Sequence, residues 1–296
     1  MKGVPQGSIL GPALFNICLN DIVYFFERSI LANFADDNTL IVQGENLQTV
    51  VNTLGQEGSI ATDWFASNFM KANPDKFHFM SAAKKADAAV NTIEIESNSI
   101  QAEDSIKLLG VHIDSRLNFN KQISEVCKKA GRQINALKRL SFYLNYNARL
   151  TAFRCFILSH LNYSPLVWMN SSKVQMGKIE KLQERALRIV LRDNKSSYAK
   201  LLTMAGVPSM RDRYQSCLLK EVYKSVNHTN PNYINNLFTA RETNYSLRGT
   251  HMLNLPKVNT TKYGLNSFTY KGAKSWNSLD NTQRSAESLQ KFMKLV

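Results

Sequence analysis

The chain has 296 residues, 44% of them hydrophobic, and a formal net charge of +14. These values indicate a globular intracellular protein of one or two domains, in the cytoplasm and/or the nucleus. A membrane protein is excluded, because the apolar run over residues 13–26 contains polar residues and is shorter than the ~18 residues of a membrane helix, and no signal peptide is recognisable.

A loop rich in glycine and proline occupies residues 3–12, with the sequence Gly-Val-Pro-Gln-Gly-Ser-Ile-Leu-Gly-Pro. Its glycines free the backbone and its prolines fix it. As structure alone, such a loop is typical of a helix entry, with Ser8 or Pro12 at the helix start. We expect one helix over residues 12–28 and a hairpin over residues 29–43.

Two adjacent aspartates, Asp36 and Asp37, lie in the middle of the expected hairpin. On a regular strand, adjacent side chains point to opposite faces, so only a bend brings both carboxylates to one site. The sequence Asp-Asp-Asn favours such a turn, and carboxylate oxygens are the ligands that hard divalent cations prefer. Taken alone, the tetrapeptide Phe-Ala-Asp-Asp is also compatible with a solvated hairpin turn.

The loop, the helix and the acidic hairpin follow one another in the order found in a polymerase palm. With them, the chain resembles the C-terminal part of the palm plus the thumb of reverse transcriptases from non-long-terminal-repeat retrotransposons. The resemblance implies nucleotidyl transfer with two divalent ions, Mg²⁺ or Mn²⁺, held by Asp36 and Asp37. The fingers and the first palm aspartate are not recognisable, so we expect a missing upstream half as a partner.

The same resemblance implies roles for the residues around the aspartates. Pro5, Gln6 and Gly7 would lie under the incoming deoxynucleotide and the template base, with Gly7 permitting close approach and Gln6 donating or accepting a hydrogen bond. Phe34 and Ala35 would line the primer side of this nucleotide- and template-binding site. The implied substrates are an RNA template, a DNA primer and deoxynucleotides.

Further along the chain, a helix is expected over residues 46–70 and strands over residues 92–96 and 100–113. By resemblance, Lys76 is a catalytic lysine that donates a proton or stabilises charge at the leaving phosphate, and the alternative is a solvated turn lysine. Leu109 and Gly110 resemble a primer-grip hairpin. The alternative there is a buried strand end in which Gly110 marks a bulge.

From residue 118 the apolar residues repeat every three or four positions, which predicts helices. Residues 1–106 contain 6 Lys and Arg against 13 Asp and Glu, whereas residues 107–216 contain 20 against 6. This segregation favours a thumb-like domain that binds the nucleic-acid backbone, with Lys128, Lys129 and Arg132 among its contacts. The alternative for these charges is a solvated helix face.

The rest of the chain carries no recognisable catalytic set. We expect Trp276 to be a packing anchor rather than a base-stacking residue. Four cysteines lack the spacing of a zinc site, which indicates reduced thiols in the core: Cys18, Cys127, Cys155 and Cys217.

The sequence therefore predicts an α+β protein in three parts. Residues 1–116 form a partial palm, an antiparallel sheet with helices. Residues 117–228 form a basic all-helical thumb-like domain, and residues 229–296 form an irregular tail with a short helix. Two functions stay open: a fragment of an RNA-directed DNA polymerase, which we expect to be inactive by itself, or a catalytically inactive nucleic-acid-binding remnant of a degenerate element.

Overall fold

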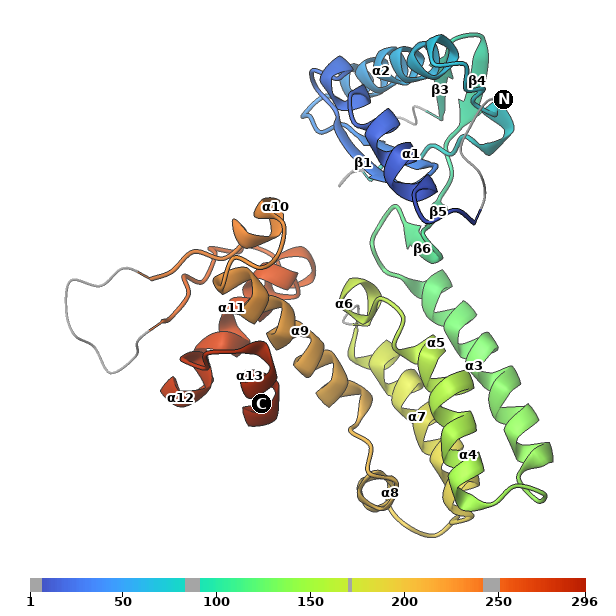
Figure 1. Ribbon diagram of the computed structural model, residues 1–296, viewed down its shortest axis with the longest axis vertical. Helices are drawn as coiled ribbons and strands as arrows, with labels where there is room; N and C mark the ends of the chain where they lie inside the picture. The colour runs from blue at the N-terminus through green and yellow to red at the C-terminus, as the bar shows by residue number, and fades with distance from the viewer. Residues whose placement is uncertain (1–6, 83–90, 170–171, 242–250) are drawn as a thin grey trace. The chain divides into compact units, whose positions relative to one another are not determined.

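The computed structural model describes residues 7–82, 91–169, 172–241 and 251–296, and it divides the chain into two compact units, residues 1–117 and 118–296 (Figure 1). The first unit combines helices with antiparallel hairpins, and the described part of the second is helical apart from one bridge between Ala240 and Leu253. The predicted α+β class is confirmed. Each unit is described by itself below.

The first unit is built from short strands around one long helix. Its elements are α1 (Gly11–Leu19), the 3₁₀ helix η1 (Ile22–Phe25), β1 (Ile30–Phe34), β2 (Asp37–Ile41), α2 (Leu47–Ser67), the 3₁₀ helix η2 (Pro74–Lys76), β3 (Thr92–Ile95), β4 (Asn98–Gln101), β5 (Ser105–Leu108) and β6 (Val111–Asp114). The named strands pair only as β1–β2, β3–β4 and β5–β6, so they form three two-stranded sheets rather than one sheet.

Two predicted elements of this unit need correction. The helix expected over residues 12–28 ends at Leu19, where the Asn20 N–H bonds to the Ile17 carbonyl at 3.3 Å and begins a tighter turn. The strand expected over residues 100–113 is divided among β4, β5 and β6, because the backbone turns between them. The helix expected over residues 46–70 is confirmed as α2, and the Asn46 side chain caps its first turn.

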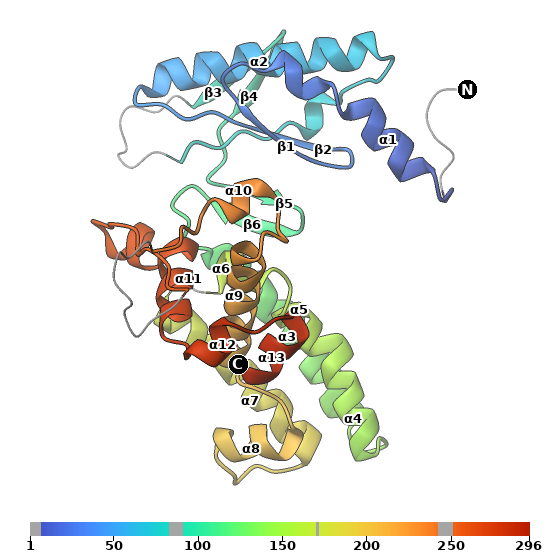
Figure 2. The ribbon, with the colours of Figure 1, turned by 60° about the vertical axis from the view of Figure 1, so that its left-hand side comes forward.

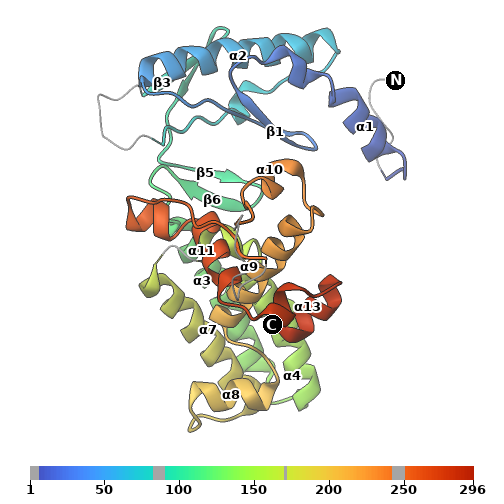
Figure 3. The ribbon, with the colours of Figure 1, turned by 90° about the vertical axis from the view of Figure 1, so that its left-hand side faces the viewer.

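Helix α2 packs on two apolar clusters. Towards its C-terminus, Trp64 packs with Leu19 and Ile22 of α1 and η1, and towards its N-terminus Val51 packs with Ile93 of β3. Figure 3 shows α2 running beside β3. A Cβ atom on Gly55 would lie 2.7 Å from the carbonyl oxygen of Glu94 in β3, so this glycine lets the helix approach the strand closely.

The second unit consists of helices whose apolar stripes face one another. Its elements are α3 (Asn120–Leu140), α4 (Tyr146–Ala152), the π-helix η3 (Phe153–Leu158), α5 (Ser159–Leu161), α6 (Pro165–Trp168), α7 (Lys173–Leu191), α8 (Tyr198–Ala205), α9 (Met210–Val226), α10 (Asn232–Asn235), the π-helix η4 (Thr261–Leu265), α11 (Phe268–Asn277), α12 (Asn281–Arg284) and α13 (Leu289–Leu295). Helices α3 and α7 and the α4–η3–α5 segment lie side by side (Figures 1 and 2). Their fully buried residues include Ala130, Ile134, Phe153 and Leu187.

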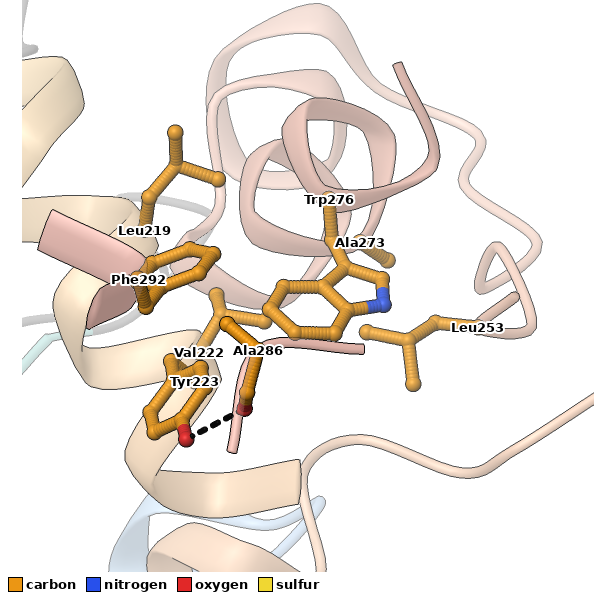
Figure 4. Packing of buried hydrophobic residues seen from close by; sticks show 8 residues of the cluster. All are labelled: Leu219, Val222, Tyr223, Leu253, Ala273, Trp276, Ala286 and Phe292. Atoms are coloured by element: carbon orange, nitrogen blue, oxygen red, sulfur yellow. Dashed lines mark hydrogen bonds between the residues drawn. The ribbon is translucent and has the colours of Figure 1, made fainter. Parts of the chain in front are cut away.

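The described C-terminal residues pack against α9 instead of forming the irregular tail predicted over residues 229–296. Figure 4 shows Tyr223 of α9 with Trp276 and Phe292, and the Tyr223 hydroxyl donates a hydrogen bond to the Ala286 carbonyl at 2.8 Å. Trp276 is fully buried, and its indole N–H donates to the His251 carbonyl at 2.8 Å. Its prediction as a packing anchor is confirmed.

None of the described helices is long and apolar enough to cross a membrane. The four cysteines are free thiols, but Cys18 and Cys155 are exposed, so the prediction that all four lie in the core is wrong. Burial raises the pKa of the Cys127 and Cys217 thiols, which are partly buried.

Candidate functional site

The β1–β2 hairpin carries the two aspartates at its tip. Phe34 pairs with Asp37 across the two strands, so Ala35 and Asp36 form a two-residue turn (Figure 2). Ala35 has a φ of 53°, in the left-handed region that such tight hairpin turns use. All four residues are exposed. The turn therefore presents two adjacent carboxylates and one aromatic ring to solvent.

The segment that leads into this hairpin is fixed by a buried acid of α2. The Glu57 carboxylate accepts hydrogen bonds from the backbone N–H groups of Glu27 at 3.1 Å, Arg28 at 2.8 Å and Ser29 at 2.8 Å. Burial opposes ionisation of Glu57, but the hydrogen bonds from Ser29, Arg28 and Glu27 outweigh it and lower the pKa of the carboxyl group. The start of β1 is therefore tied to the middle of α2.

Glu57 was not among the predicted site residues, although the sequence contains a signal for it. Glu57 lies three residues after Leu54 and seven before Trp64, so it falls on the apolar stripe of α2. An acid on an apolar stripe needs internal hydrogen-bond donors, because an unpaired buried charge is costly. Here the donors are backbone N–H groups that no side-chain pattern could reveal.

A shallow depression of about 310 Å³ lies beside the acidic turn. The α1–η1 segment, strand β1 and the turn after β1 contribute its lining. Its lining residues are Asn16, Leu19, Asn20, Val23, Leu31, Asn33 and Ala35. Residues of α1, η1 and the acidic hairpin thus line one surface, and its polar lining residues are three asparagines.

The glycine-rich loop is described only from Gly7 onward, and the predicted residues Pro5 and Gln6 lie outside the described residues. Gly7 has a φ of +80°, which suits glycine, and open space surrounds the position of a Cβ atom there. The Ser8 hydroxyl accepts a hydrogen bond from the Gly11 N–H at 3.0 Å, and Pro12 lies in the first turn of α1. The described residues of the loop, from Gly7 onward, form a helix entry.

Two other predicted site residues lie on separate elements of this unit. Lys76 ends the short helix η2 and is exposed, while the Asn73 side chain caps the same turn. Leu109 and Gly110 form the two-residue turn between β5 and β6, with φ values of 45° and 83°. Two positive φ values are those of a tight hairpin turn, so the alternative of a bulge at Gly110 is wrong.

The acidic pair meets part of what a divalent ion needs. Mg²⁺ is commonly held by one or two carboxylates together with substrate phosphates and water, and Asp36 and Asp37 are two exposed carboxylates on adjacent residues. In the part of the chain that the structure describes, no group of three His, Cys, Asp or Glu residues could hold a metal ion. The donor set therefore suits an ion that also binds substrate oxygens.

The second unit supplies a basic surface along α3. Lys128, Lys129 and Arg132 are exposed on this helix, and Lys128 forms an ion pair with Glu125 at 2.9 Å. Between Glu125 and Glu180 the sequence contains no Asp or Glu at all. This run of helices can therefore approach a polyanion without repulsion from acids of its own segment.

Comparison with known proteins gives consistent matches. Residues 1–113 match the family model described as reverse transcriptase (RNA-dependent DNA polymerase). The chain is 25% identical over 199 residues to a probable RNA-directed DNA polymerase from transposon BS of Drosophila melanogaster, which covers 64% of this chain and 22% of that protein.

Two other relatives have similar names. The RNA-directed DNA polymerase from mobile element jockey of Drosophila melanogaster is 22% identical over 63% of this chain and 21% of its own length. A Pol polyprotein from type-1 retrotransposable element R1 of Bradysia coprophila is 23% identical over 64% of this chain and 19% of its own length. The matched region thus spans about a fifth of these relatives. No solved structure matches the chain.

Proposed function

We propose that this chain, whose residues 1–113 match the reverse transcriptase family model and which is similar to retrotransposon RNA-directed DNA polymerases, supplies the acidic hairpin and the nucleic-acid-binding helices of such a polymerase. One observation carries the proposal. The two-residue turn between β1 and β2 brings two carboxylates to an exposed hairpin tip, inside the segment that matches the family model.

In this proposal, Asp36 and Asp37 hold Mg²⁺ or Mn²⁺, with Asp36 as the direct ligand and Asp37 as its partner. The ions would neutralise charge that develops on the phosphate during nucleotidyl transfer. The hairpin contributes by holding Asp36 in the turn and Asp37 directly after it, and the Glu57 hydrogen bonds keep the start of β1 in place. Two ions require more ligands than these two carboxylates. Substrate phosphates and an upstream carboxylate would provide the others.

The other predicted residues would position substrate around that tip. Gly7, with Pro5 and Gln6, would support the incoming deoxynucleotide and the template base. Phe34, which precedes the turn, and Ala35, its first residue, would contact the primer end.

Two more residues would act on the reacting groups from neighbouring elements. The exposed Lys76 would donate a proton or stabilise charge at the leaving phosphate. The β5–β6 turn at Leu109 and Gly110 would hold the primer.

The helices of the second unit would bind the RNA template and DNA primer through their phosphates. This part of the proposal is supported by the exposed Lys128, Lys129 and Arg132 and by the absence of acids between Glu125 and Glu180. Contacts to phosphates do not distinguish sequences, so this binding would position the duplex and not select it. Such a protein would work in the cytoplasm and/or the nucleus.

The test is primer extension by residues 1–296, alone and mixed with the upstream reverse-transcriptase segment of a jockey-type relative. We expect little extension by the chain alone and Mg²⁺-dependent extension by the mixture. Asp36→Asn should abolish the restored activity, whereas Asp63→Asn, which removes an exposed carboxylate from α2, should leave it unchanged. Extension that survives Asp36→Asn would overturn the assignment of the metal ligand.

The second candidate function is a nucleic-acid-binding remnant without catalysis. The basic, acid-free run of helices favours it, because that surface requires neither aspartate. Nucleic-acid binding without extension in any mixture would select this alternative.

A further inference from the structure

We propose that the turn between α3 and α4, residues 141–145, is a stacking site for unpaired bases of single-stranded nucleic acid, with the rings of Phe142 and Tyr143 as its platform. The site goes beyond the proposed polymerase function, because it requires neither the aspartates nor extension. It also differs from the phosphate contacts of α3, since its ligand is the face of a base. Figure 1 shows the turn that joins α3 to α4.

The two rings are exposed to an unusual degree for neighbouring aromatic residues. Phe142 is 81% exposed and Tyr143 is 83% exposed. Their ring centroids lie 5.6 Å apart at an interplanar angle of 86°, an edge-to-face pair that leaves ring faces open. Single exposed apolar residues are ordinary on protein surfaces, but an adjacent aromatic pair at a helix turn offers two flat surfaces together.

The backbone that carries these rings is held in place by two arginines. Arg192, at the end of α7, donates from Nη2 to the carbonyl oxygens of Ser141 at 2.7 Å and Phe142 at 3.1 Å. Arg149 of α4 donates from Nη1 to the Leu144 carbonyl at 2.6 Å and from Nε to the Val190 carbonyl at 2.8 Å. The turn is therefore fastened to α4 and α7 from both sides.

Arg149, one of the two arginines that hold the turn, is itself buried. Its side chain is only 6% exposed, and burial together with the charge of Arg192 lowers the pKa of its guanidinium. Two like charges placed beside one short turn are costly unless backbone oxygens accept hydrogen bonds from them, and here they do. A turn fixed in this way loses little conformational freedom when a ligand binds its rings.

The charges around the turn select the kind of ligand. Lys138 and Arg139, in the last turn of α3, are exposed just before the rings, and no Asp or Glu occurs between Glu125 and Glu180. Aromatic rings flanked by cations suit a single strand, whose bases stack on the rings while its phosphates meet the cations. A second copy of the chain would bring two such cationic surfaces together, which disfavours self-association there.

The experiment measures binding of residues 1–296 to two strands of equal length, a single-stranded 12-nucleotide RNA and an abasic strand with the same number of phosphates. We expect the RNA to bind about tenfold tighter than the abasic strand. The double variant Phe142→Ala/Tyr143→Ala should remove this difference and leave the salt dependence unchanged. Tyr233→Ala, which removes a 72% exposed ring from α10, should keep the difference.

A second variant separates stacking from general apolar contact. Phe142→Leu/Tyr143→Leu keeps apolar side chains without aromatic faces, and it should also lose the preference for the base-bearing strand. The proposal is overturned if the Leu variant keeps the full preference or if the Ala variant binds both strands like the wild type. It is also overturned if the ring substitutions change only self-association of the protein, measured by sedimentation. Circular dichroism of each variant confirms folding. Failure of the polymerase proposal would be seen separately, in the extension assay, which tests neither ring.

Discussion

The Glu57 carboxylate accepts the backbone N–H of Arg28 at 2.8 Å and thereby joins the middle of α2 to the chain just before the acidic hairpin. Two neighbouring N–H groups, of Glu27 and Ser29, bond to the same carboxylate. These residues precede β1, so their backbone has no partner strand to satisfy it. One side chain thus replaces several backbone hydrogen bonds and sets where the hairpin starts.

We predict that Glu57→Gln destabilises the first unit by about 1–3 kcal/mol, because a neutral amide accepts fewer and weaker hydrogen bonds from the three N–H groups. Glu45→Gln, which changes an exposed acid outside any helix or strand, is the matched control and should have little effect. Hydrogen exchange of the α2 amides, measured against urea concentration, follows unfolding of the first unit and measures the change. Equal stability of the two variants would contradict the role of Glu57.

The stability that Glu57 provides should depend on pH. Its pKa in the folded protein lies below the ordinary value of 4.5, so the unfolded chain binds a proton more readily than the folded one. The stabilisation is fully present above pH 4.5 and is lost as the pH falls through the folded-state pKa. Unfolding curves from pH 6 to pH 2.5 should converge for the wild type and Glu57→Gln at the acid end. Curves that stay parallel would mean that ionisation of Glu57 does not matter.

Two glycines in helices should respond oppositely to alanine. Gly55→Ala would place a Cβ atom 2.7 Å from the backbone oxygen of Glu94, and we expect a loss of about 1–3 kcal/mol. Gly131→Ala in α3 meets open space, so its better helix propensity should add about 0.5–1 kcal/mol. Hydrogen exchange of α2 and α3 measures each effect locally. Faster exchange of α3 in Gly131→Ala would contradict this reasoning.

The sequence allowed prediction of elements that one local pattern determines. The period of apolar residues identified α2 and α3, and turn chemistry identified the hairpin around Asp36. The arrangement of strands could not be predicted, because pairing depends on contacts between distant residues. The burial of Trp276 was predicted, but its packing on α9 was not, since short helices separated by polar stretches give weak periodicity.

The same division applies to the candidate site. Adjacent aspartates in a tight turn are a local feature, so the tip at Asp36 could be anticipated from residue types, whereas the hairpin at Gly110 was expected only from resemblance. The hydrogen-bond partners of Glu57 and of the arginines that fasten the α3–α4 turn could not be anticipated, because they are backbone groups 28 to 51 residues away in the sequence. The roles of Lys76 and Leu109 rest on resemblance and stay predictions.

The C-terminal packing can be tested at one hydroxyl. Tyr223→Phe removes the hydrogen bond to the Ala286 carbonyl and keeps the ring that stacks on Phe292 with centroids 4.6 Å apart. We expect a loss of about 1–2 kcal/mol, because the buried carbonyl is left without this donor. Tyr233→Phe, at an exposed tyrosine, is the control. Thermal unfolding should separate the two variants, and equal melting temperatures would show that the hydroxyl contributes nothing.

The last prediction concerns the basic surface of α3. Replacing Lys128, Lys129 and Arg132 by Gln should weaken duplex binding and flatten its salt dependence, because each lost phosphate contact reduces the logarithmic slope by roughly 0.7–0.9. The control triple, at Lys274, Lys291 and Lys294 on α11 and α13, removes the same charge and likewise includes one lysine paired with a glutamate.

The two triples separate a local contact from an effect of net charge. If α3 contacts the phosphates, only the first triple changes the slope, and duplexes of unrelated sequence bind equally before and after the change. The comparison comes from titrating each variant against a labelled RNA–DNA duplex at roughly 50–300 mM salt, where the affinity of such contacts depends steeply on salt. Equal slopes for both triples would mean that overall charge drives binding, and the exposed face of α3 would then be an ordinary solvated surface.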